Sequence, residues 1–157
     1  MLNALTDFIA EIAGGQRDSH FAEDDYRLAT AALLVHVITI DGVEYKDETR
    51  KLRRVLSFRF DLTVDEADEL IRTAGKREAE AVDLYGFTSV LNRALDEDCR
   101  KRIIEMMFEI AYADGELSEF EDNLVWRAAE LLNITSRDRV EIRRQVREGY
   151  DGEAAAS

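Results

Sequence analysis

The fold is decided by residues 110–121, whose sequence is IAYADGELSEFE. Apolar residues lead into Asp114 and a glycine follows it, which indicates that a helix ends at this point. Gly115 can adopt the left-handed backbone conformation that closes a helix without a side-chain clash. Ser118 and Glu121 have the spacing of a capping box, in which a hydroxyl and a carboxylate satisfy the first amides of a new helix. The stretch therefore predicts a helix, a tight turn and a second helix.

The same device occurs earlier in the chain, at residues 40–48, with the sequence IDGVEYKDE. Residues 35–59 align with residues 108–131, which are one residue shorter. Directly after these segments, the sequence FDLT at 60–63 aligns with LNIT at 132–135. Such an internal repeat predicts two copies of one helical unit, related by a pseudo-two-fold axis. The alignment pairs Asp41 with Asp114 and Glu48 with Glu121. It leaves open whether the two acidic turns lie near each other or at opposite ends of the molecule.

Composition favours a protein built from helices alone. The 157 residues contain no proline, which suits helices joined by short connections. Residues 28–40 and 103–113 are apolar over most of their length, as expected of buried helices. We predict an all-α, compact bundle of about seven or eight helices, built from two pseudo-two-fold repeats around these two central helices.

The domain organisation follows from the same patterns. Residues 1–15 form an amphipathic helix that docks on the domain or binds a partner; its apolar positions are Leu2, Leu5, Phe8, Ile9 and Ile12. Residues 16–21 form a polar linker. The helical domain spans residues 22–148, with repeat 1 at about 28–72 and repeat 2 at about 101–146. Residues 149–157 are expected to form a disordered tail, and the charged residues 76–80 a solvated face.

A resemblance to a known family arises from these motifs. An apolar helix that runs into Ala113-Asp114-Gly115-Glu116-Leu117-Ser118-x-x-Glu121, after an upstream copy, resembles the TerB-like (tellurite-resistance) family. That family includes the N-terminal domain of a membrane-anchored DnaJ-type co-chaperone. The resemblance covers about residues 26–143. The first turn departs from the pattern, because Val43 and Glu44 exchange the acidic and apolar positions and Tyr45 replaces the capping hydroxyl.

The resemblance implies an all-helical bundle, a link to tellurite or other stress responses, and acidic residues that bind metal cations. Carried over by position, these candidates are Asp41, Glu48, Asp114 and Glu121, with Glu44, Glu116 and Ser118 as auxiliary ligands. An EF-hand is rejected, because Ile110 and Tyr112 occupy the first and third positions of the loop and carry no carboxylate. The expectation is weak binding of a hard cation such as calcium or magnesium. The alternative is that these side chains only cap helices.

The charge balance limits the classes of partner. The chain has 21 Lys and Arg against 34 Asp and Glu, a net charge of −13. The negative electrostatic potential around such a chain repels phosphates, so we expect no nucleic-acid partner. Protein partners with a basic surface are better matched to this charge. No apolar stretch approaches the ~20 residues that span a bilayer, and no signal peptide is evident. We expect a cytoplasmic protein, and a homodimer through the first helix or Trp126 remains an alternative.

The sequence offers little for catalysis. Two histidines, one cysteine and no glycine-rich phosphate loop leave only carboxylates for chemistry. Cys99 falls early in a helix, where a thiolate can be favoured, but without a histidine beside it in the sequence we interpret it as a structural thiol. His36 is interpreted as a hydrogen-bonded core residue. We predict a non-enzymatic TerB-like stress-response or interaction module, with no catalytic residues and no required cofactor. The alternatives are a carboxylate-based, metal-dependent enzyme and a structural dimerisation or co-chaperone-type docking domain.

Overall fold

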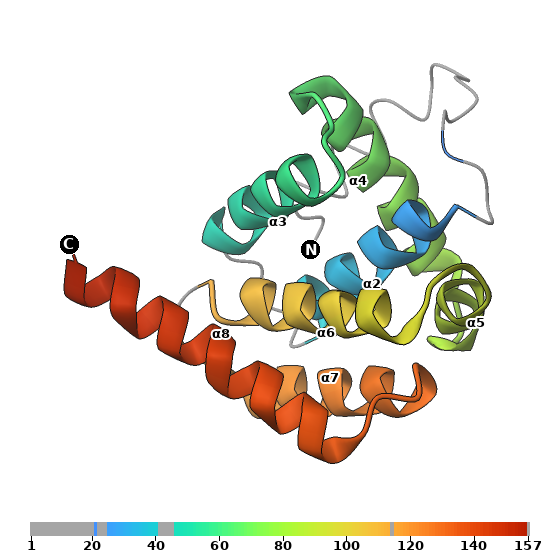
Figure 1. Ribbon diagram of the computed structural model, residues 1–157. Helices are drawn as coiled ribbons and strands as arrows, with labels where there is room; N and C mark the ends of the chain where they lie inside the picture. The colour runs from blue at the N-terminus through green and yellow to red at the C-terminus, as the bar shows by residue number, and fades with distance from the viewer. Residues whose placement is uncertain (1–20, 22–24, 41–45, 114, 157) are drawn as a thin grey trace.

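The computed structural model describes residues 21, 25–40, 46–113 and 115–156, and for residues 46, 47 and 150–156 it describes the backbone alone. These residues form seven α-helices and no strand, which confirms the predicted all-α fold (Figure 1). The predicted helix at 1–15, the first acidic turn at 41–45 and Asp114 lie outside the described residues. The helices are α2 (Tyr26–Thr39), α3 (Lys46–Arg59), α4 (Val64–Glu80), α5 (Tyr85–Ala94), α6 (Glu97–Ala111), α7 (Glu119–Leu131) and α8 (Ser136–Ala156).

Helix α2 is the centre of the core. Ten of its fourteen residues are buried, on all sides of the helix, from Leu28 to Ile38. A helix that is apolar all round has no face for water, so other helices must cover it. Helices α3, α4, α5 and α6 all pack against α2. In Figure 1, α3 and α4 lie above the centre of the bundle, α7 and α8 lie below it, and α5 lies at one end.

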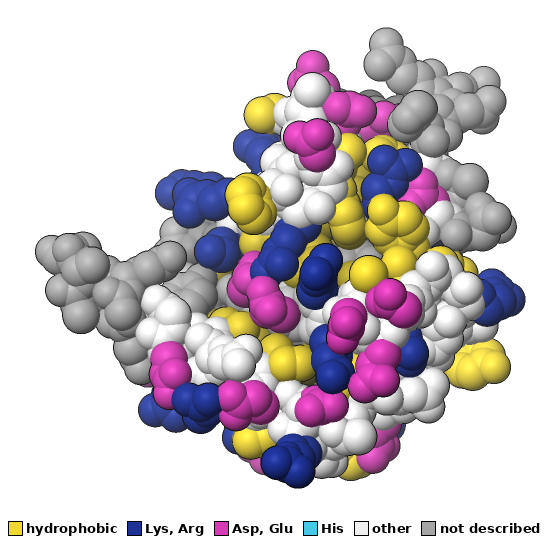
Figure 2. All heavy atoms as spheres, in the orientation of Figure 1, with side chains coloured by type: hydrophobic (Ala, Val, Ile, Leu, Met, Phe, Trp, Pro, Cys, Tyr) yellow, Lys and Arg dark blue, Asp and Glu magenta, His cyan; other side chains and the backbone are white. Residues whose placement is uncertain are grey.

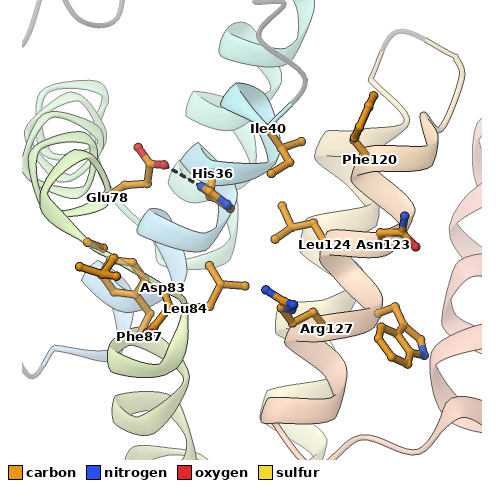
Figure 3. A pocket seen from close by; sticks show the side chains of 13 residues that line it. His36, Ile40, Glu78, Asp83, Leu84, Phe87, Phe120, Asn123, Leu124 and Arg127 are labelled. Carbon is orange, nitrogen blue, oxygen red and sulfur yellow. Dashed lines mark hydrogen bonds and ion pairs between the residues drawn. The ribbon is translucent and has the colours of Figure 1, made fainter.

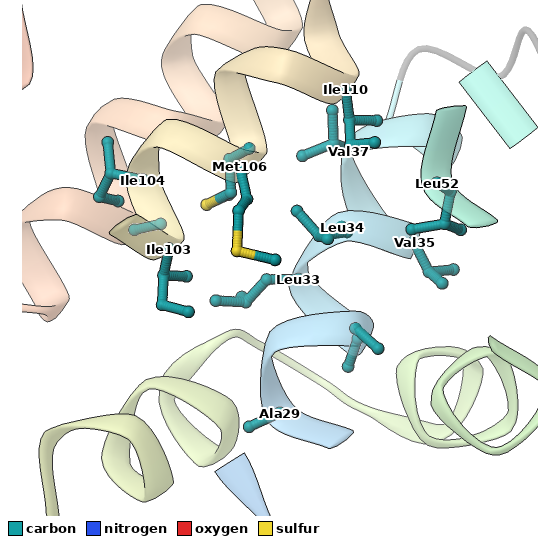
Figure 4. Packing of buried hydrophobic residues seen from close by; sticks show 14 of the residues in the cluster. Ala29, Leu33, Leu34, Val35, Val37, Leu52, Ile103, Ile104, Met106 and Ile110 are labelled. Carbon is teal, nitrogen blue, oxygen red and sulfur yellow. The ribbon is translucent and has the colours of Figure 1, made fainter. Parts of the chain in front are cut away.

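Helix α6 is the second central helix and packs directly against α2. Its buried residues are Ile103, Ile104, Met106, Met107, Phe108, Ile110 and Ala111. Figure 4 shows Leu33 close to Ile103 and, further along both helices, Val37 beside Ile110. The residue numbers increase in the same direction on both helices, so α2 and α6 run parallel to each other. Their C-terminal ends, from which the two acidic turns leave, therefore lie at the same end of the bundle.

The repeat is visible in how α3 and α7 end. Asp61 and Asn133, which the sequence alignment pairs, are the two non-glycine residues with positive φ in the described chain, at 51° and 61°. The next amide donates back five residues in each copy, from Leu62 to Ser57 O at 3.0 Å and from Ile134 to Ala129 O at 2.9 Å. This is the Schellman pattern of helix termination. Both copies of the unit thus close their middle helix in the same way.

The helices that follow begin with paired threonine caps, as the sequence predicted. The hydroxyl of Thr63 accepts from the Glu66 amide at 3.1 Å, and that of Thr135 accepts from the Asp138 amide at 3.1 Å. Asp25 and Asp96 cap α2 and α6 in the same manner. These side chains satisfy amides that have no partner inside the helix, so each fixes where its helix starts.

Two expectations at the ends of the chain were wrong. Helix α8 continues to Ala156, so residues 149–156 are not a disordered tail. The alanines at 154–156 and Glu153 are strong helix formers, and they outweigh the two glycines nearby. Phe21, assigned to a polar linker, is buried, and the Arg27 guanidinium lies 4.7 Å from the centre of its ring. An arginine over an aromatic face is a favourable contact that fixes the chain just before α2.

Two glycines with equally open surroundings test the role of backbone conformation. A side-chain carbon added at Gly115 or at Gly86 would meet no atom within 4 Å, but Gly115 has φ of +92° whereas Gly86 lies inside α5. Gly115→Ala should therefore lower the free energy of unfolding by about 1–2 kcal/mol. Gly86→Ala should raise it by roughly 0.5–1 kcal/mol, because alanine favours the helix. Urea denaturation of both variants measures the difference, and equal effects would contradict this account of the turn.

Candidate functional site

Of the acidic residues selected from the sequence, two have buried side chains. Glu48, in the first turn of α3, is 1% exposed, and Glu121, in the first turn of α7, is 2% exposed. The alignment of the repeats pairs these two residues, and both helices begin at the end of the bundle where α2 and α6 end. Asp41, Glu44 and Asp114 lie outside the described residues. The two glutamates of the proposed set thus share their position in the repeat and are buried to a similar degree.

Part of the burial of Glu121 is explained by helix capping. Its Oε1 accepts from the Ser118 amide at 3.0 Å, and the Ser118 hydroxyl accepts from the Glu121 amide at 3.1 Å. This is the predicted capping box, and it uses the auxiliary candidate Ser118 as a cap. Glu116, the other auxiliary residue, is exposed. The positive end of the α7 dipole also favours a carboxylate at this position.

Capping uses Oε1 of Glu121, while Oε2 of Glu121 and Oε2 of Glu48 are both inaccessible to solvent. Carboxylate oxygens are the ligands that calcium and magnesium prefer. Within the part of the chain that the structure describes, no group of three His, Cys, Asp or Glu side chains is arranged to hold a metal ion. The two carboxylates of Glu48 and Glu121 thus have the chemistry that suits a hard cation. A complete set of ligands requires residues beyond the described ranges.

A groove of about 500 Å³ opens beside this end of the bundle, between the end of α2 and the start of α7 (Figure 3). One wall comes from α7, through Phe120, Leu124, Trp126 and Arg127. The other comes from the connection between α4 and α5, through Val82 and Leu84, and from the first turn of α5, through Phe87. His36 and Ile40, at the end of α2, form the floor together with Glu78. Sequence reasoning missed this groove, because its walls are far apart along the chain and meet only through packing.

His36 is the polar centre of the groove. Its Nδ1 lies 2.7 Å from Oε1 of Glu78, a residue near the end of α4. The prediction of a hydrogen-bonded histidine is confirmed, although the ring is half-buried. The expectation that residues 76–80 form a solvated face was wrong for Glu78, which is turned inward and is only partly exposed. The helical period places Glu78 on the same face as Leu70, Ile71 and Ala74, which was the signal that could have identified it.

The surplus of acidic charge is not gathered on every face. On the face in Figure 2, Lys and Arg side chains are interspersed with Asp and Glu. Several of these charges form pairs between helices: Arg59 of α3 binds Glu105 and, at 2.5 Å, Glu109 of α6. Arg143 of α8 contacts Asp122 of α7 at 3.3 Å. Such pairs use basic residues to join helices.

The environment of Cys99 disfavours the thiolate form. A hydrogen bond with Asp96 raises the pKa of the Cys99 thiol above its usual range, and partial desolvation and the negative charge of Asp96 act in the same direction. The capping carboxylate thus outweighs any effect of the helix dipole on the thiol. The assignment of a structural thiol agrees with this environment.

With the geometry described, comparison with protein families gives one match. The family described as tellurite resistance protein TerB matches residues 27–144. The chain belongs to the TerB family. The match spans α2 to the first part of α8, including both buried glutamates and the groove, and it confirms the resemblance noted from the turn motif. Comparison with curated proteins and with solved structures finds no match.

Membership of the TerB family agrees with a small helical module, and family membership alone fixes neither a ligand nor a partner. Among the helices of the described residues, none combines the length and apolar character needed to cross a bilayer.

The environment of Cys99 gives a prediction about thiol chemistry in this TerB-family chain. Asp96→Asn keeps a good helix cap but removes the charge that raises the Cys99 pKa. The thiolate fraction at pH 8 should increase, so iodoacetamide should alkylate Cys99 faster in the variant than in the unmodified chain. Mass spectrometry of the modified peptide over time measures the rate. Asp98→Asn is the control, because Asp98 makes the smaller contribution to the same pKa; equal acceleration by both variants would contradict this account.

Proposed function

We propose that this TerB-family chain is a non-enzymatic binding module that holds a divalent cation, of the calcium or magnesium type, at the end of the bundle where α3 and α7 begin. The observation that carries the proposal is the burial of Glu48 and Glu121 at paired positions of the repeat. Glutamate is rarely buried to this degree, because removing a carboxylate from water costs several kcal/mol unless charge or hydrogen bonds compensate. A bound cation supplies such compensation to both copies at once.

The geometry of the central helices supports the same proposal. Because α2 and α6 run parallel, the turns that follow them leave the bundle at one end. Asp41 and Asp114 belong to those turns and are proposed to complete the ligand set with Glu48 and Glu121, with Glu44, Glu116 and Ser118 as auxiliaries. One turn alone has too few oxygens for calcium, which takes six to eight, so water or the second turn must contribute.

The absence of catalytic activity is part of the proposal and is supported by the state of the nucleophile candidates. His36 is engaged by Glu78, and the Cys99 thiol is kept neutral beside Asp96. Among the described residues, no serine, threonine or cysteine nucleophile is paired with the ring of His36. In place of catalysis, the net charge of −13 suits a protein partner with a basic surface. A role in tellurite or another stress response is the physiological setting that family membership suggests.

Cation binding can be separated from helix capping with one conservative change, Glu121→Gln. The glutamine side chain can still cap α7, because it serves at the third helical position as glutamate does, but it cannot supply a carboxylate to a metal. Calcium, magnesium or manganese at ten times its Kd should stabilise the unmodified chain by about 1.4 kcal/mol, which raises Tm by roughly 3–6 °C. Glu121→Gln should lose this increase and, with a chelator present, should be at least as stable as the unmodified chain. Differential scanning calorimetry measures both effects.

The matched control is Glu66→Gln, in the equivalent capping box of α4, where the carboxylate is not buried. This variant should keep the full increase of Tm with cation. The proposal is overturned if no cation raises Tm of the unmodified chain, or if Glu66→Gln loses the increase to the same extent as Glu121→Gln.

A further inference from the structure

The groove between α7 and the α4–α5 connection exposes a large amount of apolar surface. Val82 is fully exposed, Phe120 is 63% exposed and Trp126 is 43% exposed, while Leu84 and Leu124 lie deeper. Apolar surface in water costs roughly 25 cal/mol for each Å². A concave apolar surface lined by two helices and a connection is the shape that accepts the apolar face of an amphipathic helix.

Among the described residues, the one arginine that lines the groove has no ion-pair partner. Glu78 binds His36, and Asp83 accepts the Tyr85 amide at 2.9 Å. Arg127 extends from α7 across the groove towards Leu84 (Figure 3), and it forms no ion pair with any residue that the structure describes. In a chain with 34 acidic residues, such an arginine in a groove indicates an anionic group on the occupant.

The chain itself contains a segment with this chemistry. Residues 2–12, LNALTDFIAEI, have five large apolar residues at helical spacing. The only charged side chains in the segment are Asp7 and Glu11, which are one helical turn apart. On a helix, Glu11 lies at the edge of the apolar face beside Phe8, where it can contact a basic residue on the rim of a groove. The segment is thus both apolar and anionic.

The connection is long enough for the segment to reach the groove. Phe21 is fixed against Arg27 at the start of α2. From Tyr26 to His36, α2 rises about 15 Å. The eight residues at 13–20 span up to about 26–29 Å when extended. A segment attached in this way has an effective concentration in the millimolar range, which favours binding within one chain over binding to a second copy.

We propose that residues 2–12 bind in this groove as an amphipathic helix, with the apolar face against Phe120, Leu124 and Phe87 and with Glu11 paired to Arg127. The segment then occupies a surface that a partner helix of similar chemistry would use, so the partner must displace it. This inference does not depend on cation binding at the other site.

The exposed apolar side chains Tyr26, Phe58 and Val64 form the main rival surface. They lie closer to Phe21 along the chain, at the start of α2 and at the junction of α3 and α4. The groove is favoured because its two walls enclose an inserted helix on both sides, which buries more apolar area than one exposed face can. The test below distinguishes the two surfaces and also distinguishes binding within a chain from binding between chains.

The photo-cross-linker p-benzoylphenylalanine, introduced at position 8 of the full chain, reports where the apolar face lies. We expect cross-links within one chain to peptides containing Val82 to Phe87 and Phe120 to Arg127, identified by mass spectrometry. The same cross-linker at Asn3, on the polar side of the segment, is the control and should give at most a small fraction of that yield. Cross-links to the surface around Phe58, cross-links mainly between chains, or equal yields from positions 3 and 8 would overturn the proposal.

The ion pair is tested by charge reversal with the cross-linker kept at position 8. Arg127→Glu should lower the yield of groove cross-links by up to about fivefold, as expected for a partly exposed ion pair. Adding Glu11→Arg should restore the yield, whereas adding Asp7→Arg should restore it less. Arg127 is exposed, so this change leaves the core intact, and circular dichroism confirms that the variants fold. An unchanged yield in Arg127→Glu, or no restoration by Glu11→Arg, would rule out the proposed pairing.

Discussion

The structure depends on the need to enclose α2. This helix is apolar on every side, so its burial requires neighbours in all directions, and four other helices provide them. The largest contribution comes from α4, whose buried face includes Leu70, Ile71 and Ala74. Burying a leucine or isoleucine side chain contributes about 1.5–3 kcal/mol, so the ten buried residues of α2 account for much of the driving force for folding. Every other helix is placed directly or indirectly by this requirement.

Duplication of one helical unit meets most of that requirement. Helices α2, α3 and α4 correspond to α6, α7 and α8, and the helix ends at Asp61 and Asn133 are closed by the same hydrogen bonds. The parallel contact between α2 and α6 joins the two units through one continuous core. Additional polar contacts fix the surrounding helices: Asn92 and Arg100 donate to the last carbonyls of α7, at 2.8 and 2.6 Å. These bonds satisfy acceptors that the helix itself leaves open.

The two candidate surfaces differ in their relation to the repeat. The buried glutamates follow the pseudo-two-fold relation, since each occupies the first turn of the middle helix of its unit. The groove does not, because one of its walls includes α5, which lies between the two units and has no counterpart among the described helices. Because α5 occurs once in the chain, the groove that it helps to form also occurs once. The proposed cation site is thus a paired feature of the repeat, and the proposed docking groove is an unpaired one.

The sequence by itself determined the all-α character and several of the helix boundaries. The apolar stretch at 28–40, the capping residues Thr63, Ser118 and Thr135, and the glycine at 115 act over a few residues, so their effects can be predicted without tertiary contacts. Tertiary structure alone decided that α2 and α6 run parallel and that Glu78 meets His36. It also created the groove, whose walls come from widely separated parts of the chain. These features depend on side chains that meet only after the helices pack, and local sequence patterns contain no information about such distances.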